Sequence, residues 1–365
     1  MRQRVHSVQP VLDNIIFSLQ KAGGISMYWA ELLKHPPFCE AGFVERKDAI
    51  RNTFRAVLKT NGVRLPQPEP PLAVDRLRDV SVRSVKSKIF HSSYYRVCSD
   101  PDTLNLTTVY DFINERHRTG IGSMIHSMQK MRAIGRSNGV ICISRNTYDD
   151  MRLLAPKVPS VVEVIPMGIS EEYHPLAEIQ MSGISCMSIG ASGRKCALFV
   201  GSRARYKNFE KVVEGLRDMK GYELAIVGGG DLTQSERIIL EDALAGRYHY
   251  HGNVTNKRLN EIYNACWCLL YPSSYEGFGI PVGEAMRAGC PVIVSRTSSI
   301  PEVAGDAALY LEDVTPEGIK ATLKKLESEV MRTELVGRGL VQSRKFSWEK
   351  TASETFEFYR ALWAK

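Results

Sequence analysis

The chain has 365 residues, of which 44% are hydrophobic and 24% are charged, as in a soluble globular protein. This length exceeds one ordinary core and suits two domains of roughly 150 to 200 residues. No stretch approaches the roughly 20 apolar residues that span a bilayer, and the N-terminus lacks a signal-peptide pattern, so a cytoplasmic location is expected.

The net charge of +8 is concentrated in the first half of the chain. Residues 1–172 contain 24 Lys and Arg against 17 Asp and Glu, a balance of +7, whereas residues 173–365 contain 24 against 23, a balance of +1. A basic first half could face anionic lipid, nucleic acid or a phosphorylated acceptor, and a solvated basic surface is the alternative. No helix-turn-helix or aromatic-basic motif supports nucleic acid.

The eight cysteines include no CxxC pair, the spacing typical of zinc ligands. Cys266 and Cys268 lie in an apolar stretch, where buried thiols are the simpler interpretation. The sequence therefore predicts reduced cysteines and no structural zinc.

The first half alternates short apolar runs with helical stretches. A strand is predicted at residues 13–19, followed by a glycine-rich turn and a helix at 21–34. Further buried strands are predicted at 88–93, 106–112, 139–145 and 161–169. The segment 51–78 breaks the pattern, and its proline-rich middle is predicted to be a loop or insertion. Strands that alternate with helices indicate a parallel sheet covered on both faces.

The pattern pauses after residue 168 and then restarts. Residues 173–196, rich in Gly and Ser, are predicted to be a linker. The next strands are predicted within 196–200, 222–231, 248–254, 267–274, 291–305 and 307–313. The sequence thus predicts an α/β protein with two doubly wound, Rossmann-like domains, 1–172 and 197–349, facing a cleft. The final amphipathic helix, about 350–365, is expected to pack back on the first domain.

Loops at the carboxyl ends of the strands carry the chemistry in such folds. In the first domain, Gly24 precedes a helix whose backbone amides could approach an anion, and a plain helix start is the alternative. In the second domain, Gly201 is followed by Arg203, Arg205 and Lys207. Cations at this position suit a diphosphate leaving group, and a basic surface turn is the alternative.

The sequence AIVGGGD invites a dinucleotide-binding interpretation because glycines follow a predicted strand. The full GxGxxG pattern is absent, since Thr233 stands where the last glycine should be, and no acidic ribose ligand follows. A tight turn is therefore predicted here.

The stretch PSSYEGFGIPVGEAM at 272–286 places two carboxylates around a glycine-rich turn. Glu276 falls in the loop after a strand and Glu284 in the first turns of a helix, while Gly277 and Gly279 let the backbone approach a ligand. Carboxylates accept paired hydrogen bonds from vicinal hydroxyls. We therefore predict two polyol-binding carboxylates beside a backbone that cradles a phosphorylated ligand. An ordinary turn with a capping glutamate is the alternative.

The segment YPSSYEGFGIPVGEAMRAGCPVIVSRTSSIPEVAGDAALYLE closely resembles the C-terminal motif of retaining family 4 glycosyltransferases, which have the GT-B fold. The Glu-x7-Glu signature with EGFGIP inside it is specific. Four more stretches resemble family motifs in the expected order: GGISMYWAELL, IPMGI, LFVGSRARYKNFEKVVEGL and NVTNKRLNEIYNAC. The similarity covers nearly the whole chain and is strongest from 197 to 312.

The resemblance implies an enzyme that moves a hexose, with retention, from a nucleotide-diphosphate sugar to a saccharide acceptor. The first expected donor is GDP-mannose and the second is a UDP-sugar. The acceptor is expected to be a lipid-linked saccharide of surface polysaccharide or O-antigen synthesis, bound by the first domain. No metal or other cofactor is expected, and the basic first domain is expected to contact the cytoplasmic membrane face peripherally.

The resemblance also implies roles for matching residues in the donor domain. Glu284 is expected to hold the nucleotide ribose and Glu276 the donor-sugar hydroxyls. Lys207 matches the family's phosphate-binding lysine. The family's arginine position holds Ser202 here, so Arg203 is assigned to the diphosphate, with Arg205 as the alternative. The other expected donor contacts are Val254 beside the base and the backbones of Gly24, Gly201, Phe278, Gly279 and Ile280.

The acceptor side departs more from the family. Many members have His-Asp where this chain has Tyr110 and Asp111, so Tyr110 could keep a hydrogen bond without the basicity. His91 ends a predicted strand and resembles a family acceptor-side position, with a structural histidine as the alternative. Asp111 and Glu115 are expected to orient the acceptor. The residues assigned to catalysis are Glu276, Arg203, Lys207 and Asp111.

Other functions can be built on the same fold. A sugar-nucleotide epimerase would bind the same donor without an acceptor, and a phosphorylase would need a cofactor lysine that nothing marks here. A non-catalytic nucleotide-sugar-binding subunit is left open by Tyr110 and disfavoured by the set Glu276, Glu284 and Lys207.

Overall fold

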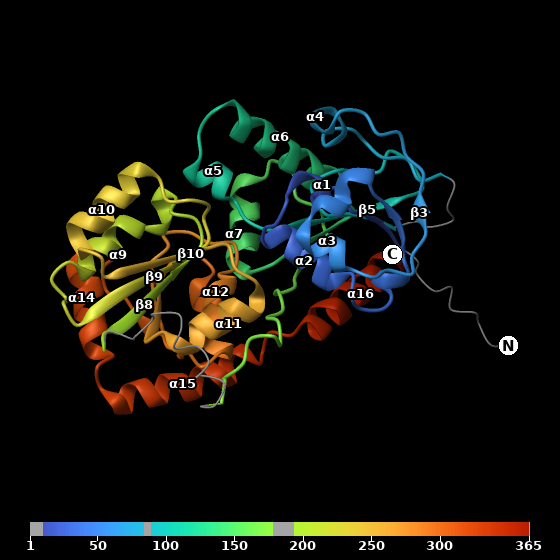
Figure 1. Cartoon of the computed structure of the whole chain (residues 1–365). Helices are drawn as coiled ribbons and strands as arrows, with labels where there is room; N and C mark the ends of the chain where they lie inside the picture. The colour runs from blue at the N-terminus through green and yellow to red at the C-terminus, as the bar shows by residue number, and fades with distance from the viewer. Residues whose placement is uncertain (1–9, 84–88, 178–192, 365) are drawn as a thin grey trace. The chain divides into compact units, whose positions relative to one another are not determined.

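The computed structural model describes residues 10–83, 89–177 and 193–364 (Figure 1). The chain divides into two compact units. Unit 1 contains the described residues up to Gly168 together with the segment from Trp348 onward, and unit 2 runs from Ile169 to Ser347. Each unit is built on its own parallel sheet, which confirms the predicted fold class of two Rossmann-like α/β domains.

Unit 1 contains a seven-stranded parallel sheet with the order β3-β2-β1-β4-β5-β6-β7. Its strands are β1 (Val11–Asp13), β2 (Gly42–Val44), β3 (Arg64–Leu65), β4 (Ile89–Ser92), β5 (Leu104–Val109), β6 (Gly139–Cys142) and β7 (Val162–Val164). The helices are α1 (Ile16–Leu19), α2 (Gly24–Leu32), η1 (Phe38–Glu40), η2 (Lys47–Arg51), α3 (Thr53–Val57), α4 (Leu72–Asp75), α5 (Ile113–His117), α6 (Ile121–Arg136), α7 (Arg145–Leu154) and α16 (Trp348–Trp363). Every residue of the central strands β4 and β6 is buried, as in a parallel sheet that is covered on both faces.

Unit 2 contains a six-stranded parallel sheet with the order β10-β9-β8-β11-β12-β13. Its strands are β8 (Lys195–Val200), β9 (Tyr222–Val227), β10 (Tyr248–Gly252), β11 (Cys268–Tyr271), β12 (Val292–Val294) and β13 (Leu309–Tyr310). The helices are η4 (Arg205–Lys207), α9 (Phe209–Leu216), α10 (Gln234–Leu244), α11 (Asn256–Ala265), α12 (Ile280–Arg287), α13 (Ile300–Ala304), α14 (Pro316–Lys325) and α15 (Glu329–Ser343). All six strands lie where the sequence predicts them, and most of them are short apolar runs followed by turn residues.

The last helix, α16, packs on the sheet of unit 1. A side chain at Gly139 would bring its Cβ to 3.0 Å from Phe358 and 3.1 Å from Leu362, so the glycine allows a close approach of the helix to this strand. Tyr359 is also fully buried in this contact. The C-terminal segment is therefore part of the core of unit 1.

The predicted strand at 13–19 is wrong for most of its length. The strand β1 ends at Asp13, and residues Ile16–Leu19 form the short helix α1. The turn is fixed by contacts that lie far away in sequence, since the Ile16 amide donates to Ser93 Oγ at 3.1 Å. Ile16 is buried in the helix as it would be in a strand, so its apolar character could not separate the two.

The proline-rich middle of the segment 51–78 is a loop, as predicted, since residues 66–71 between β3 and α4 have no regular structure. The flanking residues supply the edge strand β3 and the short helices α3 and α4. The prolines that follow β3 lack an amide donor, which is compatible with the position of this strand at the edge of the sheet. Much of the predicted linker, residues 178–192, lies outside the described residues.

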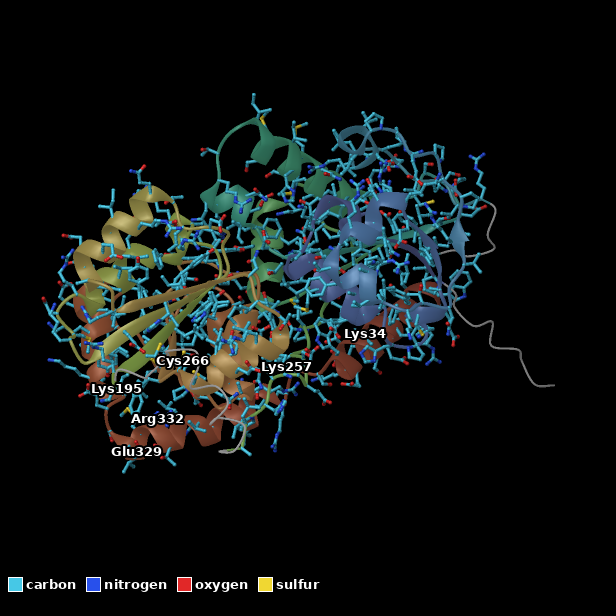
Figure 2. The ribbon with its side chains drawn as sticks, in the orientation of Figure 1. Lys34, Lys195, Lys257, Cys266, Glu329 and Arg332 are labelled. Atoms are coloured by element: carbon cyan, nitrogen blue, oxygen red, sulfur yellow. The ribbon has the colours of Figure 1, made fainter. Side chains whose placement is uncertain are left out.

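The cysteines of the described chain are free thiols; Cys186 lies outside it. Cys266 lies inside unit 2 (Figure 2), with its Sγ 3.8 Å from that of Cys196. Burial raises the pKa of the Cys290 thiol to about 12, which keeps it protonated. No group of three or more potential metal ligands occurs within the described ranges.

No helix in the described part of the chain combines the length and apolar character needed to cross a bilayer.

The chain order reverses next to one central strand in each sheet. In unit 2, β8, β9 and β10 follow one another outward, and β11 then pairs on the other side of β8. In unit 1, β4 likewise pairs on the other side of β1 from β2. Ligands of doubly wound sheets bind at such points, beyond the carboxyl ends of the strands. A ligand of unit 2 is therefore expected to bind at the loops after β8 and β11.

Candidate active site

The loops after β8 and β11 bring together the two oppositely charged residues that the sequence analysis singled out. The Lys207 ammonium lies 2.9 Å from Glu276 Oε1 and 3.3 Å from the Tyr271 hydroxyl. The side chains of Lys207 and Glu276 are each 11% exposed. A nearly buried ion pair of this kind is strengthened by low dielectric, and either partner would be costly to leave alone.

The backbone of these loops is held in register by Asn208. Its backbone is left-handed, with φ of 56°, and its side-chain amide donates to the Pro272 carbonyl at 2.8 Å and to Ser274 Oγ at 2.9 Å. The Ser274 amide donates in turn to the Tyr206 carbonyl at 2.7 Å. The loop that carries Lys207 is thus fixed to the loop that carries Glu276.

Gly201 makes room for the Lys207 side chain. Its φ is +119°, and a Cβ there would lie 3.3 Å from the Lys207 ammonium. A substitution would therefore be strained by its backbone conformation and would also crowd the cation. Sequence reasoning placed Gly201 at the strand end, and the structure adds this close approach.

Glu276 is also anchored through its backbone. Its amide donates to Ser298 Oγ at 2.9 Å, and its carbonyl accepts from the Ser299 hydroxyl at 2.9 Å. Both serines follow β12, and Ser298 has a positive φ of 49°. The Glu276 side chain is therefore positioned by three neighbouring strand-end loops. Sequence reasoning missed both serines, although SRTSS after a predicted strand was a visible signal.

Glu284 lies in the helix α12, in an almost fully buried position. Its Oε2 accepts a hydrogen bond from the Tyr263 hydroxyl at 3.1 Å. Burial raises the pKa of Glu284 to about 7, while hydrogen bonds from Tyr263 and Tyr173 act in the opposite direction. Both tyrosines were missed, because they lie in α11 and in the segment predicted as linker.

The start of α12 exposes backbone polar groups next to these carboxylates. Gly279, with φ of +97°, precedes Ile280, and no side chain caps the helix. The first amides of an uncapped helix are unpaired within the helix and attract anions. The Phe278 ring packs edge-on against Phe346 at 5.5 Å, so the backbone at this position is the part suited to a ligand.

Arg203, which the sequence analysis assigned to the diphosphate, is buried against a neighbouring turn. Its guanidinium donates to the carbonyls of Gly228 at 2.9 Å and Gly230 at 2.9 Å, and its Nε lies 2.7 Å from Glu236. Its side chain is 3% exposed. Arg203 thus supports the glycine turn after β9, and the alternative residue, Arg205, is the exposed cation of the loop.

The glycine turn itself is the tight turn that the sequence predicts. Gly228, Gly229 and Gly230 all have positive φ, and Thr233 caps α10 in a capping box with Glu236. The residue that breaks the dinucleotide pattern therefore has a structural role. Val254, the expected base contact, is half-buried in the turn after β10.

In unit 1, His91 is not on an acceptor-facing surface, and the acceptor-side assignment is corrected. The imidazole is fully buried, with Nδ1 2.5 Å from the Tyr359 hydroxyl and Nε2 2.8 Å from Thr108 Oγ1. Burial lowers the pKa of His91 to about 3. His91 is therefore a neutral core residue that links β4 and β5 to α16.

Tyr110 is buried as well. Its hydroxyl donates to the Ser93 carbonyl at 3.3 Å, and its ring meets Tyr28 edge-on at 5.4 Å. Burial raises its pKa well above 10, so it remains a neutral hydrogen-bond donor. Gly24, in contrast, lies exposed at the first position of α2, where the amides of a helix start are available.

Asp111 and Glu115 share one buried cation. Lys130 donates to the Asp111 carbonyl at 2.7 Å and to Glu115 Oε2 at 2.9 Å, and its side chain is fully buried. Burial is the largest single effect and raises the pKa of Glu115. The charge of Lys130 acts in the opposite direction, and the pKa ends below its ordinary value. Glu115 therefore fixes the start of α5, whereas the half-buried Asp111 caps it by accepting from the Ile113 amide at 3.0 Å.

Residues 189–336 match the protein family described as Glycosyl transferases group 1. The O-antigen chain mannosyltransferase B of Escherichia coli is 32% identical over 174 residues, which are 46% of this chain and 46% of that protein. The serotype-specific mannosyltransferase WbdA of Escherichia coli is 27% identical over 80% of this chain and 39% of that protein. The matches thus span less than half of either relative.

The solved structures agree on the fold. The structure of HepE from Anabaena, in complex with UDP and glucose, has a TM-score of 0.74 to this chain at 14% identity and covers 96% of this chain and 99% of that one. The strand-end loops with Glu276, Glu284 and Lys207 lie inside the segment that matches the family. Residues 189–336 of this chain therefore resemble the group 1 glycosyltransferases, and the chain has the GT-B fold of the solved structures.

Proposed function

We propose that this protein is a retaining glycosyltransferase that takes a hexose from a nucleotide-diphosphate sugar. The observation that carries the proposal is the Lys207–Glu276 pair at the point where the sheet of unit 2 reverses its order, with Glu284 and the uncapped start of α12 beside it in sequence. This combination offers a cation and backbone amides for phosphates, and carboxylates for hydroxyls.

The donor fits these groups by their chemistry. Lys207 and the backbone amide of Ile280 would bind the diphosphate, with Arg205 as the second cation of the loop. Glu276 would accept from sugar hydroxyls once the diphosphate draws Lys207 away from it. Glu284 would accept from the ribose, and Val254 would contact the base. The names of the curated relatives support mannose, so GDP-mannose is the first candidate and a UDP-sugar the second.

The transfer itself breaks the bond between the anomeric carbon and the diphosphate oxygen. The acceptor oxygen forms its new bond on the same face of the sugar, and the acceptor proton passes to an oxygen of the departing diphosphate. Lys207 and the Ile280 amide stabilise the charge that develops on that group. The acceptor is proposed to be a saccharide on a lipid carrier, as in O-antigen synthesis, with Asp111 of unit 1 orienting it.

The donor proposal is tested by thermal unfolding with GDP, UDP, ADP and dTDP and their sugars. A ligand at 100 times its dissociation constant stabilises the folded protein by about 2.7 kcal/mol, and we expect this for one nucleotide class only. The shift should disappear in Glu284→Ala, because the ribose loses its acceptor. Glu214→Ala, on the exposed side of α9, is the control and should keep the shift.

A different pattern would favour one of the other functions. Stabilisation without transfer to any acceptor would favour a non-catalytic subunit, and conversion of the donor sugar without an acceptor would favour an epimerase. The absence of a shift with every nucleotide would contradict the donor site.

We also propose peripheral contact with an anionic membrane through α6. Four large apolar side chains lie on its outer face at the spacing i, i+3, i+4, i+7, and they are exposed to these extents: Ile121 74%, Met124 58%, Ile125 39% and Met128 65%. Arg116 and Arg118 immediately precede this stripe, and the first half of the chain is basic. Apolar insertion beside cationic residues is how an interfacial helix binds anionic lipid.

Vesicle flotation measures this contact. We expect the protein to float with phosphatidylglycerol vesicles at low salt, to float less at high salt because screening weakens the attraction, and not to float with neutral vesicles. Replacing Met124 and Met128 by serine should abolish flotation, whereas Val330→Ser, an exposed apolar residue of unit 2, should not. Flotation that ignores both salt and the stripe would refute the proposal.

A further inference from the structure

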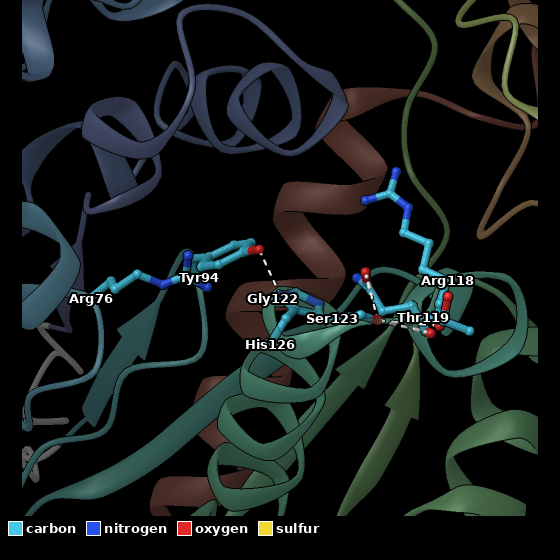
Figure 3. Close-up of a pocket in the computed structure, with 8 residues that line it drawn as sticks. Arg76, Tyr94, Arg118, Thr119, Gly122, Ser123 and His126 are labelled. Carbon is cyan, nitrogen blue, oxygen red and sulfur yellow. Dashed lines mark hydrogen bonds between the residues drawn. The ribbon is translucent and has the colours of Figure 1, made fainter.

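Unit 1 contains a cavity of about 400 Å³ at the N-terminal end of α6 (Figure 3). We name it the α6 pocket, and it is lined by Arg76, Tyr94, Asn114, Arg118, Thr119, Gly122, Ser123 and His126. None of these residues was assigned a role from the sequence. Its volume is within the range of roughly 300 to 1,000 Å³ that is typical of small-molecule sites.

The lining of the α6 pocket is cationic, with two arginines, one histidine and no acid. The Arg76 guanidinium donates to the amide oxygen of Gln129 at 3.2 Å, and its buried Nε has no partner. The Arg118 side chain forms no ion pair with any part of the chain that the structure describes. On the same helix, in contrast, Arg132 and Arg136 are both paired with Asp79 at 2.7 Å. The pocket thus holds two guanidinium groups without a carboxylate partner.

The third basic group of the α6 pocket is neutral at physiological pH. His126 Nδ1 lies 2.8 Å from the Tyr94 hydroxyl, as the dashed line in Figure 3 marks. Burial lowers the pKa of His126 to about 4; the charges of Lys130, Arg76 and Arg118 act in the same direction, and the charge of Glu115 acts in the opposite one. A positive field in the cavity is consistent with this shift. An anion that entered the pocket would be attracted by that field.

The backbone adds donors to the same cavity. The first hydrogen bond of α6 runs from the Met124 amide to the Gly120 carbonyl at 3.1 Å, so the amides of Gly122 and Ser123 precede it. The helix is 16 residues long, and its positive end therefore meets the pocket. The hydroxyls of Ser123 and Thr119 and the amide of Asn114 supply further polar groups along the wall.

We propose that the α6 pocket binds a phosphate-bearing group. Phosphate matches the planar guanidinium of Arg76 and Arg118 and the amides of a helix start, and these are the groups that the cavity offers. The pocket lies beyond the carboxyl ends of β4 and β5, since Tyr94 and Asn114 follow those strands, and ligands of such sheets bind at this edge. Resting on the proposed function, we assign the phosphate to the acceptor, whose sugar would meet the neutral polar wall.

The test uses the full-length protein without donor and two kinds of phosphate. Glucose 1-phosphate is titrated calorimetrically, with glucose as the uncharged reference, and phosphatidylglycerol vesicles present the phosphate of a lipid headgroup. Gly122→Leu fills the cavity, and it should fold because a Cβ at Gly122 meets nothing within 4 Å and leucine favours a helix. Arg76→Gln and Arg118→Gln remove the charges, and Arg152→Gln on the exposed face of α7 is the matched control.

We expect glucose 1-phosphate to bind and glucose not to bind. Each arginine variant should weaken binding about tenfold or more, since each loses a charged hydrogen bond. Gly122→Leu should abolish binding, and Arg152→Gln should match the wild type. Vesicle binding that Gly122→Leu abolishes, without binding of the sugar phosphate, supports the same pocket with a lipid headgroup as its ligand.

Two results would overturn the proposal. One is the absence of binding by both phosphates, and the other is binding that survives Gly122→Leu, including vesicle binding that depends only on Met124 and Met128. The donor shift of unit 2 is measured on the same variants. It depends on Glu284 and not on the α6 pocket, so failure of the pocket and failure of the proposed function give different results.

Discussion

Replacing Lys207 by methionine is expected to lower the rate of sugar transfer by about 100- to 1,000-fold, the loss typical when one preorganised group at a developing charge is removed. The ammonium lies at the end of β8, 2.9 Å from Glu276, and is nearly buried. Methionine fills a similar volume without the charge. The variant would leave the departing diphosphate without its cation and Glu276 without its partner.

The loss should appear mainly in kcat, because the charge on the diphosphate is greatest as it departs. Steady-state kinetics with the nucleotide sugar chosen by the unfolding panel would measure it. Lys211→Met, on the exposed side of α9, is the matched control and should retain full activity. A Lys207→Met variant with a wild-type kcat would move the phosphate-binding role to Arg205 or to the backbone of α12.

The sheet of unit 2 could be predicted from the sequence because its signals are local. The strands β8, β9, β11 and β12 are largely apolar runs, and each is followed by a glycine, proline or serine. Glu276 and Glu284 flank a turn whose glycines have a conformational reason. Gly279 has a positive φ, as a close approach of the backbone suggested. β8 and β11 are neighbouring strands, so the loops that follow them bring Lys207 and Glu276 together.

The site assignments that do not fit the structure have a common physical cause. Arg203 and His91 are polar residues at strand ends, and such residues are either functional or satisfied by distant partners. The partner of His91 is Tyr359, 268 residues later in the chain, and the partners of Arg203 are the carbonyls of a turn about 25 residues later. A single sequence contains no signal for these contacts. The α6 pocket was missed for the same reason, since Arg76 and His126 are separated by strands β4 and β5.

Arg96→Met is expected to cause the largest loss of stability in unit 1. The guanidinium is 2% exposed; its Nε donates to Asp13 at 2.9 Å, a second nitrogen pairs with Asp13, and a third lies 3.0 Å from Asp75. Asp75 keeps Arg46 at 2.9 Å, whereas among the residues that the structure describes the Asp13 carboxylate keeps only the hydroxyl of Ser92 at 2.8 Å. A buried carboxylate that loses its cation costs about 3–5 kcal/mol.

The loss can be separated from a packing defect. Urea unfolding followed by tryptophan fluorescence reports on unit 1 through Trp29, whose indole donates to Asn14 at 2.7 Å. Adding Asp13→Asn to Arg96→Met removes the unpaired charge and should recover part of the stability, whereas a packing defect would persist. Arg145→Met breaks an ion pair with Asp149 whose side chains are 67% and 60% exposed, so it should cost less than about 1 kcal/mol. If Arg96→Met cost no more than that control, the strand β1 would not depend on its buried ion pair, and the loop after β4 that carries Tyr94 would need another anchor.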